Sequence, residues 1–257
     1  MSTTGQDLLH DPGPGDRWLA VVAHPDDESF GCGSVLARAA ARGAAVTVVC
    51  ATRGEAGEPA PGTAQGELGA VREAELRRAA GHLGVTAVEV LDHRDSGFDG
   101  APGHGALCAV PVDALAAELH AVVARVRPDV AVVLDGSDGH RDHLHVRAAV
   151  RAALVGTDRP ALYEHCLPNT LMRQWLDEMR RVRPGTAYHA LDPASLGRAD
   201  AEVTDVLDVR DVLDRREAAI AEHRSQVSPF DGLSPALRAA FLTRDSLVRV
   251  HPERHEP

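Results

Sequence analysis

The stretch WLAVVAHPDDE, residues 18–28, decides the fold of this chain. Residues 18–23 are apolar and predict a buried strand, and the polar residues His24 to Glu28 follow at once. Small residues at 31–34 then lead into a helical pattern. Open α/β sheets place their chemistry at the carboxyl ends of strands, and His and Asp are ligand types for zinc and for hard metals. The stretch therefore indicates a metal-dependent hydrolase on an α/β fold.

Apolar runs alternate with amphipathic stretches along the rest of the chain, as in successive βαβ units. The pattern predicts a Rossmann-like, doubly wound, mostly parallel sheet flanked by helices. Strands are expected at 18–23, 46–51, 88–92, 130–135, 161–165 and 202–206. Helices are expected at 35–42, 67–83, 112–126, 144–154 and 211–223. Between them, the polar segments 52–66 and 93–111 are expected to be loops over strand ends.

The length of 257 residues and a hydrophobic content of 44% suffice for one large core. We expect residues 1–16 to form a loose leader and residues 17–257 a single domain. Residues 17–165 would hold the metal site. Residues 166–257 would add strands, a helix and a C-terminal cap or lid near the edge of the sheet.

The net charge of the chain limits the binding partners that it could have, and its cysteines indicate the cellular compartment. A net charge of −11 argues against nucleic acid and anionic membranes and favours a small neutral or cationic substrate. No run reaches the roughly 18 apolar residues of a membrane span. The four cysteines are scattered and predict reduced thiols and a cytoplasmic protein. The sequence leaves the oligomeric state open, a homo-oligomer included.

A second polar cluster, GSDGHRDH at residues 136–143, follows the strand expected at 130–135. Because loops after parallel strands can converge on one crevice, His24, Asp27 and His143 could supply the three ligands of a hydrolytic zinc site. Asp26 and Asp27 cannot face the same way on a turning backbone, so Asp26 would remain as the general base for a zinc-bound water.

His140, Asp142 and Glu28 are given supporting roles. His140 lies three residues before His143, on the same face of a helical turn, and if protonated it could stabilise the oxyanion and return a proton to the amine. Asp142 could hold an imidazole nitrogen of a metal ligand or cap the helix. Glu28 could support a ligand in the same way or complement the helix dipole.

Residues 23–28 (AHPDDE) and 140–143 (HRDH) together resemble the PIG-L or LmbE-like deacetylases, zinc enzymes that remove the acetyl group from N-acetylglucosamine-type amino sugars. Further similar segments are TRGEAG at 52–57, REAE at 72–75, LGV at 83–85 and DSG at 95–97. The resemblance implies one Zn²⁺ per chain, other divalent metals being compatible with the same ligands. It implies that His24, Asp27 and His143 bind zinc, that Asp26 is the base and that His140 is the electrophile or acid.

The resemblance also implies that Arg72 and Asp95 hold substrate hydroxyls or a polar head group, although Arg72 could instead form a helix-surface ion pair with Glu75. His223 and Gln226 resemble a family segment near the site. The chain departs from the family at Arg141, where the second motif usually has proline. This change restores a backbone N–H and leaves the spacing of the histidines intact.

The favoured function is therefore zinc-dependent removal of an N-acetyl or other N-acyl group from an amino sugar or its conjugate, a small-molecule substrate. Two alternatives remain. One is a metal-dependent phosphoesterase, which would require basic residues that bind the phosphate. The other is a non-catalytic sugar or nucleotide binder. Phe98, Trp175 and Phe230 are the candidates for stacking on a sugar, with core packing as the alternative. Residues 93–111 and the tail after residue 228 are expected to set specificity.

Overall fold

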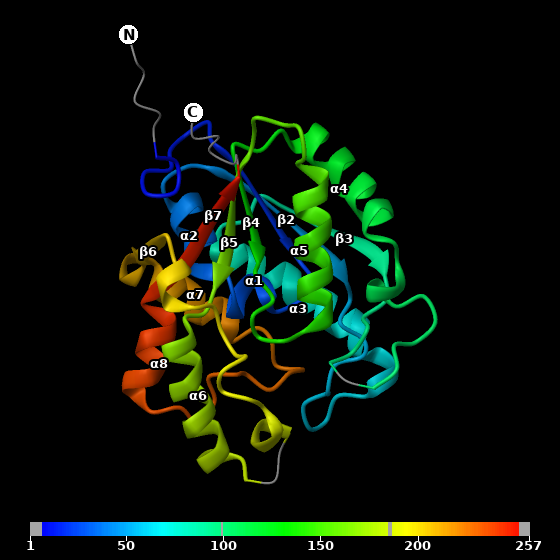
Figure 1. The fold of residues 1–257 in the computed structure, drawn as a ribbon, viewed down its shortest axis with the longest axis vertical. Helices are drawn as coiled ribbons and strands as arrows, with labels where there is room; N and C mark the ends of the chain where they lie inside the picture. The colour runs from blue at the N-terminus through cyan, green and yellow to red at the C-terminus, as the bar shows by residue number, and fades with distance from the viewer. Residues whose placement is uncertain (1–6, 99, 185–186, 252–257) are drawn as a thin grey trace.

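A mostly parallel sheet of seven strands runs through the computed structural model, which describes residues 7–98, 100–184 and 187–251 (Figure 1). The strand order is β3-β2-β1-β4-β5-β7-β6. β1 to β5 pair in parallel, and β7 is antiparallel to both of its neighbours. The predicted fold class is confirmed. The strands are β1 Arg17–Val22, β2 Ala45–Thr52, β3 Ala87–His93, β4 Val130–Leu134, β5 Ala161–Cys166, β6 Asp205–Asp208 and β7 Arg244–His251.

The strand order reverses at β1, which has β2 on one side and β4 on the other. Such a switch point opens a crevice at the carboxyl ends of the two central strands, because their connections leave in opposite directions. His24 follows the end of β1, and the segment that contains His140 follows the end of β4. The topology thus brings both polar clusters to one crevice.

Both faces of the central sheet are buried, as expected for parallel strands covered by helices. In β1, Trp18, Ala20 and Val22 pack into one apolar cluster, and Leu19 and Val21 pack into another. The first cluster is covered by α2 Gly33–Ala41, α3 Leu68–Leu83 and α7 Leu213–Ile220, and the second by α4 Val112–Val126 and α5 Arg141–Ala153. Figure 1 shows α4 and α5 side by side on one side of the sheet.

The C-terminal third contains elements that the sequence analysis missed. α6 Asn169–Val182 and α8 Pro235–Leu242 share a third apolar cluster, which includes Trp175 and Phe230. Met172, Trp175, Leu176 and Met179 have helical spacing, so the signal for α6 was present. β7 was expected to be part of a cap, but it inserts between β5 and β6. Its sequence RDSLVRVH gives a weak strand signal, because polar and apolar residues alternate only in the last four positions and its neighbours in the sheet lie far away in sequence.

Several predicted boundaries were wrong by a few residues. The helix predicted at 144–154 begins at Arg141, and the strand predicted at 202–206 is β6, at Asp205–Asp208. The helix predicted at 211–223 ends at Ile220. The segments 52–66 and 93–111 are largely loops, with short 3₁₀ turns at Gln65–Glu67 and Leu107–Ala109.

The predicted loose leader is wrong for residues 7–16, because Leu9 is buried in the first apolar cluster. The Arg42 guanidinium also donates to the carbonyl of His10, at 2.9 Å. Residues 1–6 of that prediction lie outside the described residues. All four cysteines are described and are free thiols. Within the described ranges, no helix is both long and apolar enough to cross a membrane.

A buried arginine ties the C-terminal part of the chain to the loop behind the first polar cluster. Arg216, on α7, donates to the carbonyl oxygens of Ser29, Phe30 and Gly31 at 2.7–3.1 Å. Its guanidinium also lies 3.0 Å from the carboxylate of Asp245 on β7, and both side chains are almost fully buried. The backbone that follows the HPDDE residues is therefore held by residues about 190 positions later.

We expect Arg216→Met to lower the free energy of unfolding by about 3–5 kcal/mol, because it leaves the Asp245 carboxylate buried without its cation. Urea unfolding followed by circular dichroism measures this. The matched control is Arg210→Met, whose exposed ion pair with Asp208 should contribute at most about 1 kcal/mol. Equal losses in the two variants would contradict a structural role for the Arg216 contacts.

Candidate metal centre

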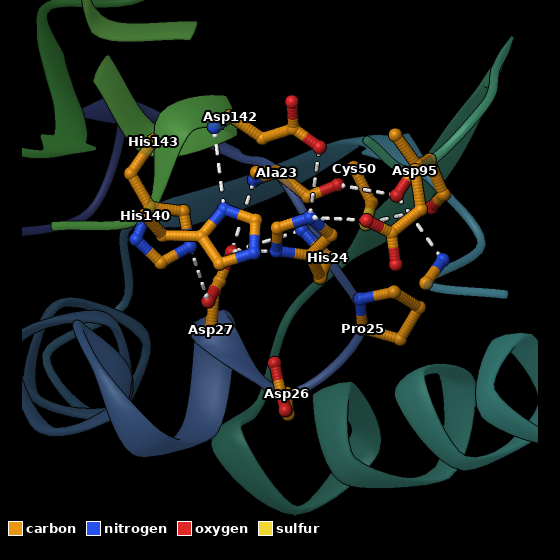
Figure 2. A network of polar contacts seen from close by, with 12 residues as sticks. Ala23, His24, Pro25, Asp26, Asp27, Cys50, Asp95, His140, Asp142 and His143 are labelled. Carbon is orange, nitrogen blue, oxygen red and sulfur yellow. Dashed lines mark hydrogen bonds and ion pairs between the residues drawn. The ribbon is translucent and has the colours of Figure 1, made fainter. Parts of the chain in front are cut away.

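The first cluster is shaped by a sharp backbone turn between β1 and α1 Asp27–Phe30, a short helix that the sequence analysis missed. Asp26 has a φ of 128°, which is unusual for a residue with a side chain. The turn sends the two adjacent carboxylates to separate places, as Figure 2 shows. Asp27 Oδ2 accepts hydrogen bonds from the backbone N–H groups of Ala23 and His24, at 3.0 and 2.9 Å. This leaves Asp27 Oδ1 available to a ligand.

The ring of His24 has two carboxylates on one side and the carboxylate of Asp27 on the other (Figure 2). Its Nε2 lies 3.2 Å from Asp142 Oδ2 and 3.4 Å from Asp95 Oδ1. Since a carboxylate accepts, Nε2 carries the proton and the lone pair of the neutral ring is on Nδ1. Nδ1 lies 3.7 Å from Asp27 Oδ2, so this lone pair is on the side of the ring that faces Asp27.

In His143, in the first turns of α5, the two ring nitrogens have the opposite roles to those in His24. Its Nδ1 donates to Asp138 Oδ2 at 2.7 Å. Its Nε2 is buried without a hydrogen-bond partner and lies 3.2 Å from Asp27 Oδ1. In their neutral forms the two imidazoles would present lone pairs towards the two oxygens of one carboxylate, and each is held from behind by another carboxylate. Histidine ligands of metals commonly have such a partner.

His24, Asp27 and His143 are the predicted donor set, but two other groups of residues bring one ligand atom each within 4.8 Å of one another. One is formed by the ring nitrogens of His24, His140 and His143. However, His140 Nδ1 already accepts the backbone N–H of Asp142, so its Nε2 carries a proton and is a donor. In the group of His24, Asp95 and Asp142, the nitrogen that faces the two carboxylates is His24 Nε2, which carries a proton and donates to Asp142.

The charge of the site also suits a cation. Burial lowers the pKa of His24, but Asp142 and Asp95 outweigh burial and raise it to about 9. Burial acts likewise on His143, and Asp138 and Asp27 raise its pKa well above the usual range. Although burial raises the pKa of Asp27, His143 and His24 bring it below its usual range. The excess of carboxylates that would hold protons on these rings would equally hold a divalent cation.

Asp26 lies beside this group without belonging to it. Burial raises the pKa of its carboxyl to about 6, and Arg72 opposes the shift. The Arg72 guanidinium lies 3.3 Å from Asp26 Oδ2 and donates to the carbonyl oxygens of Pro25 and Gly54. The alternative that Arg72 forms a surface ion pair with Glu75 is wrong, because Arg72 is buried and Glu75 accepts from Ser225 instead.

His140 is the N-cap of α5, and its side chain, not that of Asp142, caps the helix. The expectation that Asp142 is an N-cap is therefore wrong, and Asp142 is a buried partner of His24. The His140 ring lies 4.5 Å from that of His24 and 4.9 Å from that of His143, between centroids. Burial, reinforced by these rings, lowers the pKa of His140 to about 4. The structure thus favours a neutral His140, in contrast to the protonated form considered from the sequence.

Glu28, His223 and Gln226 form a chain of contacts behind the turn. Glu28 is fully buried and accepts the backbone N–H of Asp26 at 2.9 Å. Its other oxygen lies 2.7 Å from His223 Nε2. Gln226 donates to the carbonyl of Pro25 at 3.1 Å. These three side chains, from two distant segments, support the backbone that holds Asp26 in its unusual conformation.

Asp95 and Arg141 lie at the side of the site. Asp95 contacts His24, and its carboxylate also accepts from the backbone N–H groups of Ala56 and Gly97. The sequence analysis assigned Asp95 to the substrate alone and did not predict its contact with His24. The Arg141 guanidinium donates to the carbonyl of Gly100, at 3.1 Å, so it contacts the loop at 93–111.

Asp138 was missed as a functional candidate. It stands two residues before His140, and the signal was its place in the cluster GSDGHRDH, although only the fold shows that it faces Nδ1 of His143.

We expect Asp138→Asn to weaken zinc binding by about 10- to 100-fold, because the amide orients the ring without a charge. Competition titration with a zinc chelator measures this, and an unchanged affinity would exclude the role. Asp113→Asn, on the exposed surface of α4, is the control.

The chain was compared with known families and proteins. The model of the family PIG-L: GlcNAc-PI de-N-acetylase matches residues 19–154. A 1D-myo-inositol 2-acetamido-2-deoxy-alpha-D-glucopyranoside deacetylase of Streptomyces avermitilis is 35% identical, with 95% of each chain covered.

Solved structures share the fold at lower identity. An N,N'-diacetylchitobiose deacetylase from Pyrococcus horikoshii has a TM-score of 0.61 and 19% identity, over 91% of this chain and 84% of that one. GalB, a 4-carboxy-2-hydroxymuconate hydratase from Pseudomonas putida, also has a TM-score of 0.61, at 20% identity, over 94% of this chain and 99% of that one. Because one fold serves a deacetylase and a hydratase, the fold alone does not decide the reaction. The family model covers more than half of the chain and the Streptomyces relative nearly all of it, so this chain belongs to the PIG-L family.

Proposed function

We propose that the chain is a zinc-dependent hydrolase that removes an N-acyl group, such as acetyl, from an amino sugar or an amino-sugar conjugate. The observation that carries the proposal is the pair of imidazole lone pairs facing Asp27, with the separate carboxylate of Asp26 beside them. The names of the relatives, which are deacetylases of acetamido sugars, support the same reaction class.

His24, Asp27 and His143 would hold the ion. The chemistry that zinc supplies when bound is a water of lowered pKa and polarisation of the amide carbonyl. Asp26, whose pKa of about 6 is close to neutral pH, takes the proton from the attacking water. Arg72 keeps that carboxylate in place through its contacts with Asp26 and with the neighbouring backbone.

His140 and Asp26 complete the reaction. The neutral His140 ring offers Nε2–H as a donor to the carbonyl oxygen as negative charge develops there. The water oxygen bonds to the carbonyl carbon, and the C–N bond then breaks. The proton held by Asp26 passes to the leaving nitrogen, so the products are an amine and a carboxylic acid. Asp95 would also contact sugar hydroxyls at the edge of the site, whereas Arg72, predicted to do the same, is buried and lines neither adjoining cavity.

Metal analysis together with an assay of amine release from N-acetylglucosamine and its glycosides tests the proposal. We expect about one zinc per chain and hydrolysis that stops when a chelator removes the metal. A protein that releases no amine from any N-acyl sugar after zinc is added is not this hydrolase. The phosphoesterase alternative gains no support, since no lysine or arginine lines the cavity at the candidate centre within the described part of the chain.

A further inference from the structure

A largely apolar cavity of about 350 Å³ opens directly beside the candidate metal centre. Asp26, Asp27, His140 and His143 line one end of it. The rest of its wall includes apolar side chains from the end of β4, from α6 and the segment after it, and from α8 and the segment before it, such as Leu134, Met172, Trp175, Leu196, Phe230 and Phe241. We call this cavity the apolar chamber. Its other polar residues are His165 and those of the loop after β4.

A second hollow, of about 440 Å³, lies on the other side of Phe98 and has a different character. Its polar lining includes Glu55, Arg94, Asp95 and His104. Phe98 lines both spaces, and its ring lies 5.6 Å from that of His140. The apolar chamber, which borders the candidate centre, and this polar groove, which borders Asp95 beside His24, therefore share Phe98 as a wall.

The two spaces suit the two halves of an N-acyl amino sugar differently. Each sugar hydroxyl that is buried without a hydrogen-bond partner costs free energy, so the sugar belongs in the polar groove. The acyl group then points into the apolar chamber. At about 30 Å³ for each water, the chamber has room for roughly ten water molecules. An acetyl group would fill little of this space with its single methyl.

We propose that the apolar chamber binds the acyl chain of the substrate, and that this chain is a medium-length fatty acyl group rather than acetyl. The inference rests on the proposed hydrolase function and names its substrate class. It differs from the chemistry in the names of the relatives, which refer to acetamido sugars. Filling the chamber with methylene groups gains hydrophobic free energy that acetyl cannot supply.

A series of N-acyl glucosamines with acetyl, butanoyl, hexanoyl and octanoyl groups tests the inference with the zinc-loaded enzyme. We expect kcat/KM to rise with chain length, by up to about fourfold for each added methylene. The octyl glycoside of N-acetylglucosamine carries its chain on the sugar instead. A rate that falls beyond acetyl, or that rises only with the octyl glycoside, overturns the assignment of the chamber to the acyl chain.

A binding measurement separates this inference from the proposed function. The chain has two tryptophans: Trp175 lines the chamber, and Trp18 is fully buried in the core. We expect octanoate to change the fluorescence of Trp175 and acetate to leave it unchanged, and we expect Trp175→Phe to abolish the response. If no N-acyl sugar is hydrolysed but octanoate still binds, the proposed hydrolase function is wrong, whereas the chamber does bind acyl chains. If an N-acetyl sugar is hydrolysed and octanoate does not bind, the assignment of the chamber to an acyl chain is wrong.

A matched pair of valine variants completes the test. Val227 lies on the chamber lining and Val206 lies away from it on β6, and both are exposed enough to accept a larger side chain. We expect Val227→Phe to lower the ratio of octanoyl to acetyl kcat/KM by about tenfold, and Val206→Phe to leave that ratio unchanged. Equal ratios in both variants and the parent protein would count against the chamber.

Discussion

Replacing Asp26 by Asn is expected to lower the turnover of an N-acyl glucosamine by about 10²- to 10⁴-fold, while the zinc content stays near one per chain. The amide keeps the size of the side chain but cannot take the proton from water. Zinc should remain, because Asp26 lies outside the set formed by His24, Asp27 and His143. Amine release and metal analysis on the same sample measure both quantities.

The control is Asp92→Asn, the same substitution at a carboxylate whose side chain is almost fully exposed, and it should leave turnover unchanged. If Asp26→Asn turns over normally, Asp26 is not the base. If it also loses zinc, the carboxylate either binds the metal or maintains the turn at φ 128°. A protein that only binds sugars would show no catalytic loss, so this variant also separates an enzyme from a binder.

The sequence predicted the residues near the strand ends better than it predicted their contacts. His24 and His143 stand 119 positions apart, and their convergence follows from the parallel order of β1 and β4, which apolar periodicity indicates. The tautomers of these rings depend instead on Asp138, Asp142 and Asp95, whose directions are set by the loops after β3 and β4 and by the first turn of α5. Such directions have no periodic signal.

The protonation of His140 illustrates the same limit. From the sequence it is an imidazole beside a metal, which could be neutral or protonated. Its role as the N-cap of α5 requires a lone pair on Nδ1, and two neighbouring rings disfavour a further positive charge. Both facts depend on where α5 begins, and helix ends are the least predictable part of a helix.

Replacing His143 by Ala is expected to reduce the zinc content from about one per chain to near zero after dialysis, and turnover by several orders of magnitude with it. Only His24 and Asp27 of the three ligands would remain. The fold should persist, because the Asp138 side chain that loses its partner is partly exposed to water. Metal analysis after dialysis measures the first effect, and circular dichroism checks the fold. His82→Ala, at an exposed histidine on α3, is the control.

His140→Ala makes this experiment decisive about the ligand set. Both rings lie close to His24, so proximity alone does not tell a ligand from a hydrogen-bond donor. If the lone pairs are placed as the contacts with Asp138 and Asp142 require, His140→Ala keeps its zinc and loses turnover, whereas His143→Ala loses both. If the His143→Ala variant keeps its zinc and the His140→Ala variant loses it, the assignment of His143 as the ligand and His140 as the hydrogen-bond donor is wrong. Under the proposed function, the hydrogen-bond partner of each ring sets its role: carboxylates hold His24 and His143 as ligands, and the backbone N–H of Asp142 leaves His140 as a donor.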